Sequence, residues 1–157
     1  MKGGKDVKQT PDLEKVQERM KPGVISSYGF LGTDDRKLID ILDEDDKKVT
    51  ALGLTHQKIA DRLQYFYEKA KHATGSWVTV DEHFAVYVDD VRGYMPCPFG
   101  DPGLYPKNYV IVENKKINER LIFSYLSIHL IREHGFYQGR GSPFRIDPEA
   151  AKRILEM

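Results

Sequence analysis

The sequence contains a single cysteine, Cys97, among 157 residues. One thiol cannot form an internal disulfide, and sparse cysteine is typical of proteins from a reducing compartment. The chain also lacks a run of about 18 apolar residues, which a membrane-spanning helix requires. Its first 16 residues contain no apolar segment like that of a signal peptide. We therefore expect a soluble, cytoplasmic protein with no membrane partner.

An excess of charge of either sign is absent too, because 24 Lys and Arg residues balance 24 Asp and Glu residues. A neutral chain lacks the long-range attraction on which most nucleic-acid binders rely. The segment THQKIADRL, 55–63, resembles the first helix of a helix-turn-helix motif. The following residues, QYFYEKAKHA, continue the helical pattern without a glycine turn or a second helix. We therefore expect no nucleic-acid partner.

The residues that are present are typical of one folded domain. Hydrophobic residues make up 40% of the chain and charged residues 31%, and the sequence has no internal repeat. A chain of this length can bury most of the surface that it exposes when unfolded. We expect a single domain over residues 1–157, with the Lys- and Gly-rich residues 1–10 mobile.

Helical periodicity dominates the first half of the sequence. The clearest helix is predicted over 54–73, where apolar residues at i, i+4, i+7 and i+11 share one stripe and Thr55 precedes as a cap. A short helix is predicted over 12–20. A further helix is expected to be capped by Thr33 and to break in the charged run 43–48.

The second half changes to the two-residue period of strands. Alternating apolar residues predict four strands, at 77–80, 84–91, 109–113 and 120–123. A helix is expected over 124–133 with Gly135 as its left-handed cap, and a last helix should start at Pro148 with Asp147 as its cap. The pattern predicts an α+β fold, with helices packed on one face of an antiparallel sheet of about four strands.

One connection, GYMPCPFGDPGLYPKN at 93–108, is too long to be a simple turn. It holds four of the eight prolines and three glycines. Connections of this length without secondary structure are commonly functional or disordered, and the aromatic residues here argue against disorder. Pro96 and Pro98 restrict the backbone around Cys97, so we expect its thiol to have a defined position.

Two segments carry a family resemblance. PCPFGDPGLY and SIHLIREHGFYQGRGSPFR, and more weakly YGFLGTDDR and LGLTHQKIADRL, resemble the signature segments of a family of small bacterial cytosolic proteins without an assigned activity. The resemblance covers roughly residues 22–150, almost the whole of one domain. It implies a bacterial origin and a cytosolic location, and it implies no mechanism.

Metal binding is one chemistry that the residues allow. Cys97, His129, His134 and His56 offer one sulfur and three imidazoles, the ligand types that zinc or another divalent transition metal prefers. His129 and His134 are five residues apart, so they share a metal only if the helix ends between them. The alternative is a core histidine at position 129 and a histidine stabilised by the helix dipole at position 134.

Catalysis by the thiol is a second chemistry. Cys97 could act as a nucleophile with His129 or His134 as the base, and Arg92 could stabilise the thiolate. The alternative is that Cys97 is only a small buried hydrophobic residue.

Anion binding is the third chemistry. In GFYQGRGSPFR, the glycines allow close backbone approach, and Arg140, Ser142 and Arg145 suit a phosphate or a carboxylate. Neither arginine is obviously needed for packing, so we expect its replacement by alanine to leave the melting temperature nearly unchanged. The alternative is a surface turn with two solvated arginines.

Two classes of function follow. The first is a small-ligand or metal-binding protein, or an enzyme, that acts on an anionic small molecule in a pocket between 93–108 and 134–145. The second is a non-enzymatic interaction or homodimerisation module, whose partner surface would be formed by Phe99, Tyr105, Phe136 and Tyr137. The first class gains if Cys97 and the histidines meet within about 4 Å of a common point.

Overall fold

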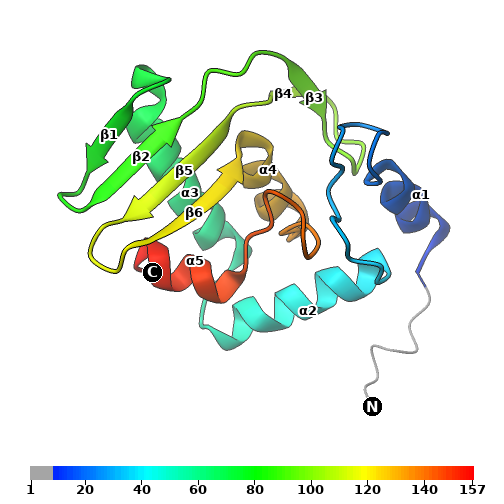
Figure 1. The fold of residues 1–157 in the computed structure, drawn as a ribbon. Coiled ribbons are helices and arrows are strands. Elements are labelled where there is room, and N and C mark those ends of the chain that lie inside the picture. Colours follow the sequence, from blue (N-terminus) through cyan, green and yellow to red (C-terminus); the bar gives the residue numbers. More distant parts are fainter. Residues whose placement is uncertain (1–8) are drawn as a thin grey trace.

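A four-stranded antiparallel sheet organises the molecule, and its helices pack on one face (Figure 1). The computed structural model describes residues 9–157. Residues 1–8, which are most of the segment 1–10 that we expected to be mobile, lie outside the described residues. The predicted α+β class is confirmed. No helix in the described part of the chain is both long and apolar enough to cross a membrane.

The sheet has the strand order β1-β2-β5-β6, and every neighbouring pair is antiparallel. Its strands are β1 (Trp77–Val80), β2 (Phe84–Val88), β5 (Tyr109–Asn114) and β6 (Glu119–Ser124). A separate two-stranded hairpin consists of β3 (Tyr94–Pro96) and β4 (Leu104–Pro106). The helices are α1 (Pro11–Arg19), α2 (Leu38–Ala51), α3 (His56–Ala70), α4 (Tyr125–His134) and α5 (Pro148–Leu155), and a 3₁₀ turn, η2 (Lys71–Ala73), follows α3.

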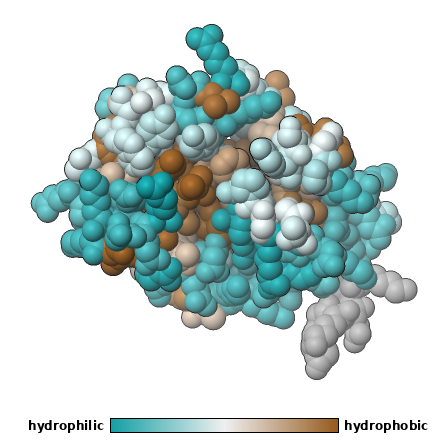
Figure 2. All heavy atoms as spheres, in the orientation of Figure 1, coloured by the Kyte–Doolittle hydropathy of each residue, from teal (hydrophilic) through white to brown (hydrophobic). Residues whose placement is uncertain are grey.

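Alternation along the strands explains which face is covered. The inward residues of β2 and β5, such as Val86 and Val112, are fully buried against α3, α4 and α5. Residues of the other face, such as Ile111 and Ile122, stay partly exposed. Figure 2 shows hydrophobic side chains in the middle of the molecule, over the sheet, between hydrophilic rims.

A second apolar cluster joins α1, α2, α4 and the β3–β4 hairpin. It includes Met20, Leu38, Leu130 and Phe136, and it also contains Cys97, which is 2% exposed. This cluster fixes the hairpin against α4. The side chains that carry the candidate chemistry lie where these two elements meet.

Several local predictions are confirmed. Thr55 caps α3 by accepting a hydrogen bond from the Lys58 backbone N–H, and Asp147 caps α5 in the same way. Gly135 ends α4 with φ of +60°, in the left-handed region that a helix cap needs.

Four local predictions were wrong. Thr33 does not cap α2, which starts at Leu38, because its backbone N–H and hydroxyl donate to the Arg140 carbonyl instead. Helix α2 runs unbroken through 43–48, because the buried member of that run, Asp45, is paired with Arg145.

The other two errors concern the segment between β2 and β5. Strand β2 ends at Val88 rather than at residue 91, because the buried Asp89 carboxylate turns the chain by accepting from the backbone N–H groups of Tyr109 and Val91. The 93–108 connection is not free of secondary structure, since it forms the β3–β4 hairpin.

Candidate metal centre

Helix α4 positions two histidines because of how it begins and ends. Ser124 and Ser127 form a capping box at its start, in which each side chain binds the other residue's backbone N–H. The helix stops at His134, and the left-handed Gly135 follows. His129 lies in the middle of the helix and His134 is its last residue, so the expectation that they could meet only if the helix ended between them was wrong. Both belong to α4, and both Nε2 atoms nevertheless contact the Asp101 carboxylate.

The β3–β4 hairpin supplies two further groups. Cys97 follows β3 directly, and the Gly100 backbone N–H donates to the Cys97 carbonyl at 3.0 Å. This turn, with φ of +92° at Gly100, brings Asp101 back beside Cys97. The Arg19 side chain of α1 donates to the Pro98 carbonyl at 2.8 Å and anchors the turn.

Four potential ligand atoms meet at this point. Cys97 Sγ, Asp101 Oδ2, His129 Nε2 and His134 Nε2 all lie within 4.8 Å of one another. Asp101 Oδ2 is 2.6 Å from His134 Nε2 and 2.7 Å from His129 Nε2. Cys97 Sγ is 3.8 Å from Asp101 Oδ2 and 3.9 Å from His134 Nε2.

These separations are close to those of a tetrahedral zinc site. With metal–ligand bonds of about 2.0–2.3 Å, neighbouring ligand atoms stand about 3.3–3.6 Å apart. The contacts of Asp101 with the two histidines are shorter than this range, and the sulfur contacts are slightly longer. Side-chain shifts of less than about 1 Å would therefore bring all four atoms to coordination distance.

Aromatic residues hold the two imidazoles in place. The Phe99 ring stacks on the His134 ring, with 4.0 Å between centroids and 5° between planes. The Tyr105 ring lies 4.6 Å from the His129 ring, and its hydroxyl is 3.3 Å from His129 Nδ1. Because the two rings are already held in one orientation, less side-chain conformational entropy is lost when a metal binds.

The two other residues of the expected partner surface are in the core. Phe136 and Tyr137 are each 1% exposed, and Phe136 packs edge-on against Phe99. The surface formed by Phe99, Tyr105, Phe136 and Tyr137 is therefore not present. Phe99 and Tyr105 support the histidines instead.

The charge state of the centre suits a cation. Hydrogen bonding from His134, and then from His129, lowers the pKa of Asp101, which is therefore a carboxylate. Burial raises the pKa of the Cys97 thiol, which is therefore protonated in the metal-free protein near neutral pH. A metal that binds sulfur must displace this proton.

The same geometry disfavours a thiol nucleophile. In a Cys–His–Asp arrangement, one ring nitrogen faces the thiol and the other faces the acid. Here Cys97 and Asp101 both approach Nε2 of His134. The raised pKa of Cys97 also opposes formation of a thiolate without a metal. The four groups are arranged around a common centre and do not form a relay.

His56, the fourth sequence candidate, lies elsewhere. Its Nδ1 is 2.8 Å from the Tyr137 hydroxyl, and its Nε2 is 2.9 Å from Asp46 Oδ1. A side chain at Gly135 would collide with its ring. His56 satisfies the hydroxyl of a buried tyrosine, and the fourth group of the centre is Asp101, which sequence reasoning missed.

The expected anion-binding residues all have partners within the chain. Arg145 makes a two-pronged ion pair with the buried Asp45, at 2.5 and 2.9 Å. Arg140 binds Glu44 at 3.1 Å, and the Ser142 hydroxyl donates to Gln138 Oε1 at 2.5 Å. The acidic run of α2 thus supplies the carboxylates that were expected from a ligand.

We expect zinc affinity to fall as pH decreases from 8 to 6. Binding displaces the Cys97 proton, because burial raises the pKa of this thiol, and each displaced proton changes affinity about tenfold per pH unit. Below about pH 6 imidazole side chains ordinarily take up protons and compete as well. A competition titration with a chromophoric chelator at pH 6, 7 and 8 measures the slope, and Cys97→Ser should flatten it between pH 7 and 8. Constant affinity from pH 5 to 8 would exclude the thiol and both histidines as ligands.

Comparisons with family models, with curated proteins and with solved structures found no match. The chemistry of this centre therefore rests on its own geometry, and the family resemblance of the signature segments stays a prediction.

Proposed function

We propose that this protein binds a divalent transition metal, zinc above all, through Cys97, Asp101, His129 and His134. The observation that carries the proposal is the convergence of four donor atoms, within 4.8 Å, from two elements that are separate in sequence. A thiolate, two imidazoles and a carboxylate are the donors that zinc takes in proteins. A hard ion such as Mg²⁺ or Ca²⁺ prefers oxygen donors, and this centre offers one carboxylate among softer groups.

The bound metal would join the β3–β4 hairpin to α4. The hairpin has little core of its own, since Tyr94 and Leu104 are 64% and 65% exposed. Coordination by Cys97 and Asp101 on one side and by two α4 histidines on the other would fix the hairpin in place. Metal binding would therefore contribute to folding free energy.

An enzymatic role is the second candidate, and the exposure of Asp101 favours it. The Asp101 side chain is 34% exposed, against 18% for His129 and 20% for His134. A carboxylate ligand on the solvent side can be replaced by water or by a substrate, and catalytic zinc sites keep one position for such a ligand. A hollow of about 160 Å³ adjoins His129, and its lining includes Tyr105 and Arg132. A small anionic substrate remains the proposed substrate class, and an interaction or homodimerisation module would need a surface other than that of Phe99, Tyr105, Phe136 and Tyr137.

Elemental analysis tests the proposal. We expect the full chain, purified without chelators or a metal-affinity column, to carry zinc or another divalent transition metal, at up to one ion per chain. Cys97→Ser and His134→Ala should each lower this content sharply, because each removes one ligand. His72→Ala, at an exposed histidine outside the cluster, is the matched control and should keep the parent's content. A parent protein that stays free of metal after reconstitution with excess zinc would refute the proposal.

A further inference from the structure

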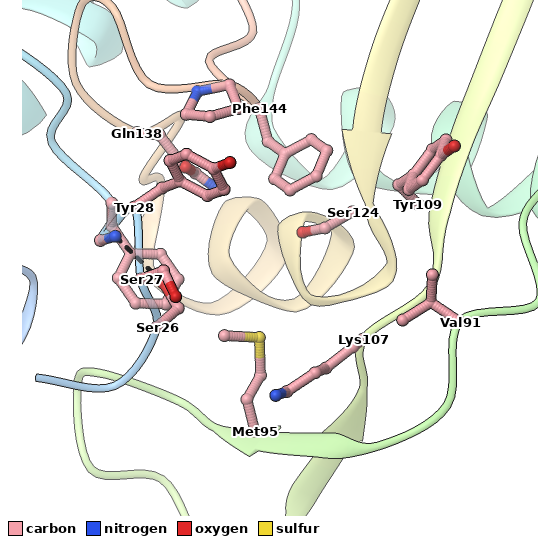
Figure 3. A pocket seen from close by; sticks show the side chains of 13 residues that line it. Ser26, Ser27, Tyr28, Val91, Met95, Lys107, Tyr109, Ser124, Gln138 and Phe144 are labelled. Carbon is pink, nitrogen blue, oxygen red and sulfur yellow. Dashed lines mark hydrogen bonds between the residues drawn. The ribbon is translucent and has the colours of Figure 1, made fainter. Parts of the chain in front are cut away.

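A second cavity lies apart from the metal ligands, none of which lines it. It has a volume of about 310 Å³ and is formed by residues of 26–30, 91–95, 107–109, 124 and 138–144 (Figure 3). The segments that form it come from both halves of the chain. The cavity is therefore formed by segments that are distant in the sequence, and no single motif predicts it.

The walls of this cavity are mainly apolar. They are formed by Tyr28, Phe30, Val91, Met95, Tyr109, Pro143 and Phe144. The centroids of the Tyr109 and Phe144 rings are 6.3 Å apart, and the ring planes are inclined at 28°. A dry cavity of about 150 Å³ already holds benzene. The present cavity therefore has room for one ring or a branched apolar group and a short polar head.

Lys107 is the only charged residue in the lining, which contains no acidic residue. Its side chain extends across the lower side of the cavity in Figure 3, toward Met95. The ion pairs that lysines make within residues 9–157 do not include Lys107. Its backbone N–H donates to the Gly93 carbonyl at 3.0 Å, and its side-chain stem lies beside Gly93.

Gln138 supplies a second polar group. It is 2% exposed, and its Oε1 accepts from the Ser142 hydroxyl at 2.5 Å. Its amide nitrogen has no hydrogen-bond partner among residues 9–157, and the side chain lines the cavity behind Tyr28 (Figure 3). No buried side-chain nitrogen or oxygen of the described residues lacks a partner, so the Gln138 amide nitrogen is accessible from the cavity and can donate to water or to a ligand there.

The backbone holds Gln138 in a strained position. Its φ is +70°, in the left-handed region that a residue with a side chain rarely adopts. Arg145 donates to its carbonyl at 2.9 Å, and the next N–H, that of Gly139, donates to the Phe30 carbonyl at 2.9 Å. Such strain persists only where the surroundings enforce it, and it is common at ligand sites.

From this arrangement we infer that the cavity binds a small monocarboxylate with an aromatic or branched apolar body. The apolar body would pack between Tyr28, Met95 and Phe144. The carboxylate would accept from the Lys107 ammonium on the lower side of the cavity, and the Gln138 amide on the opposite side would donate to a polar substituent of the body (Figure 3). A phosphate fits less well, because its two charges would face one ammonium and apolar walls. The inference does not depend on the proposed metal.

Titration of the ¹⁵N-labelled full chain with phenylacetate tests the inference by NMR. We expect saturable shifts of the backbone amide signals of Met95, Lys107 and Gln138. Phenylacetamide, a neutral probe of the same shape, should bind about fivefold more weakly, as expected for the loss of a partly solvated ion pair. Acetate, which lacks the ring, should give no saturable shift.

Variants assign the effect to the cavity. Lys107→Gln should remove the preference for phenylacetate over phenylacetamide, and the exposed Lys116→Gln in the β5–β6 turn should not. Cys97→Ser should leave phenylacetate binding unchanged, so failure of the metal proposal would not affect this result. Absence of saturable shifts around the cavity would overturn the inference. Equal binding of the two probes, unaffected by Lys107→Gln, would do so too.

Discussion

Replacing Arg145 with alanine is expected to destabilise the protein by about 3–5 kcal/mol, because it leaves a buried carboxylate without its partner. The Arg145 side chain is 15% exposed, and that of Asp45 is 3% exposed. Two hydrogen bonds join them, and Arg145 also donates to the Gln138 carbonyl. This expectation replaces the one drawn from sequence, in which Arg145 was an anion-binding residue whose replacement by alanine would leave the melting temperature nearly unchanged.

Arg140→Ala is the matched control for this experiment. The Arg140 side chain is 60% exposed, and its ion pair with Glu44 should contribute about 0–1 kcal/mol. Denaturant unfolding of the parent and both variants measures the difference. At roughly 2–4 °C per kcal/mol, Arg145→Ala should melt about 6–20 °C below the parent. Equal free energies of unfolding for the two variants would show that the buried Arg145–Asp45 pair contributes no more to stability than the exposed Arg140–Glu44 pair.

The second large effect is stabilisation by zinc. An ion that binds only the folded state raises the free energy of unfolding by about 2.7 kcal/mol at a hundredfold excess over the dissociation constant, and by about 4.1 kcal/mol at a thousandfold excess. The four ligands join two elements, so their release requires the hairpin and α4 to separate. We expect the melting temperature to rise by roughly 5–15 °C between chelator-treated and zinc-loaded protein.

Two variants show whether this stabilisation comes from the centre. Asp101→Asn keeps the size of the side chain but weakens a ligand, so it should reduce the zinc effect. His72→Ala removes an exposed histidine outside the cluster and should keep the full effect. An equal rise in melting temperature in Cys97→Ser and in the parent would place the stabilising ion elsewhere.

The predictions that held depend on neighbouring residues. Thr55, Gly135 and Asp147 act on backbone groups within a few positions, so the sequence around them carries the signal. The predictions that failed depend on distant residues. The break expected at 43–48 is absent because Arg145, a hundred residues away, stabilises the buried Asp45.

The candidate centre was predictable only in part, for a similar reason. Cysteine and histidine are rare enough in this chain for Cys97, His129 and His134 to attract notice. Asp101 is one of 24 acidic residues, and nothing in its local sequence separates it from the others. His56 has the right chemistry but lies beside Tyr137 and Asp46. Residue type suggests the ligands, and the fold decides which of them meet.

Cobalt substitution tests the central claim most directly, because Co²⁺ takes the place of zinc and reports its ligands by absorption. If Cys97, Asp101, His129 and His134 surround the ion, the Co²⁺ form should show the intense visible bands of a tetrahedral site. It should also show a near-ultraviolet band from thiolate-to-cobalt charge transfer, with a one-to-one end point. Cys97→Ser should abolish the charge-transfer band, and zinc should remove both sets of bands. Weak bands of octahedral cobalt, with no charge-transfer band in the parent, would contradict the proposed centre.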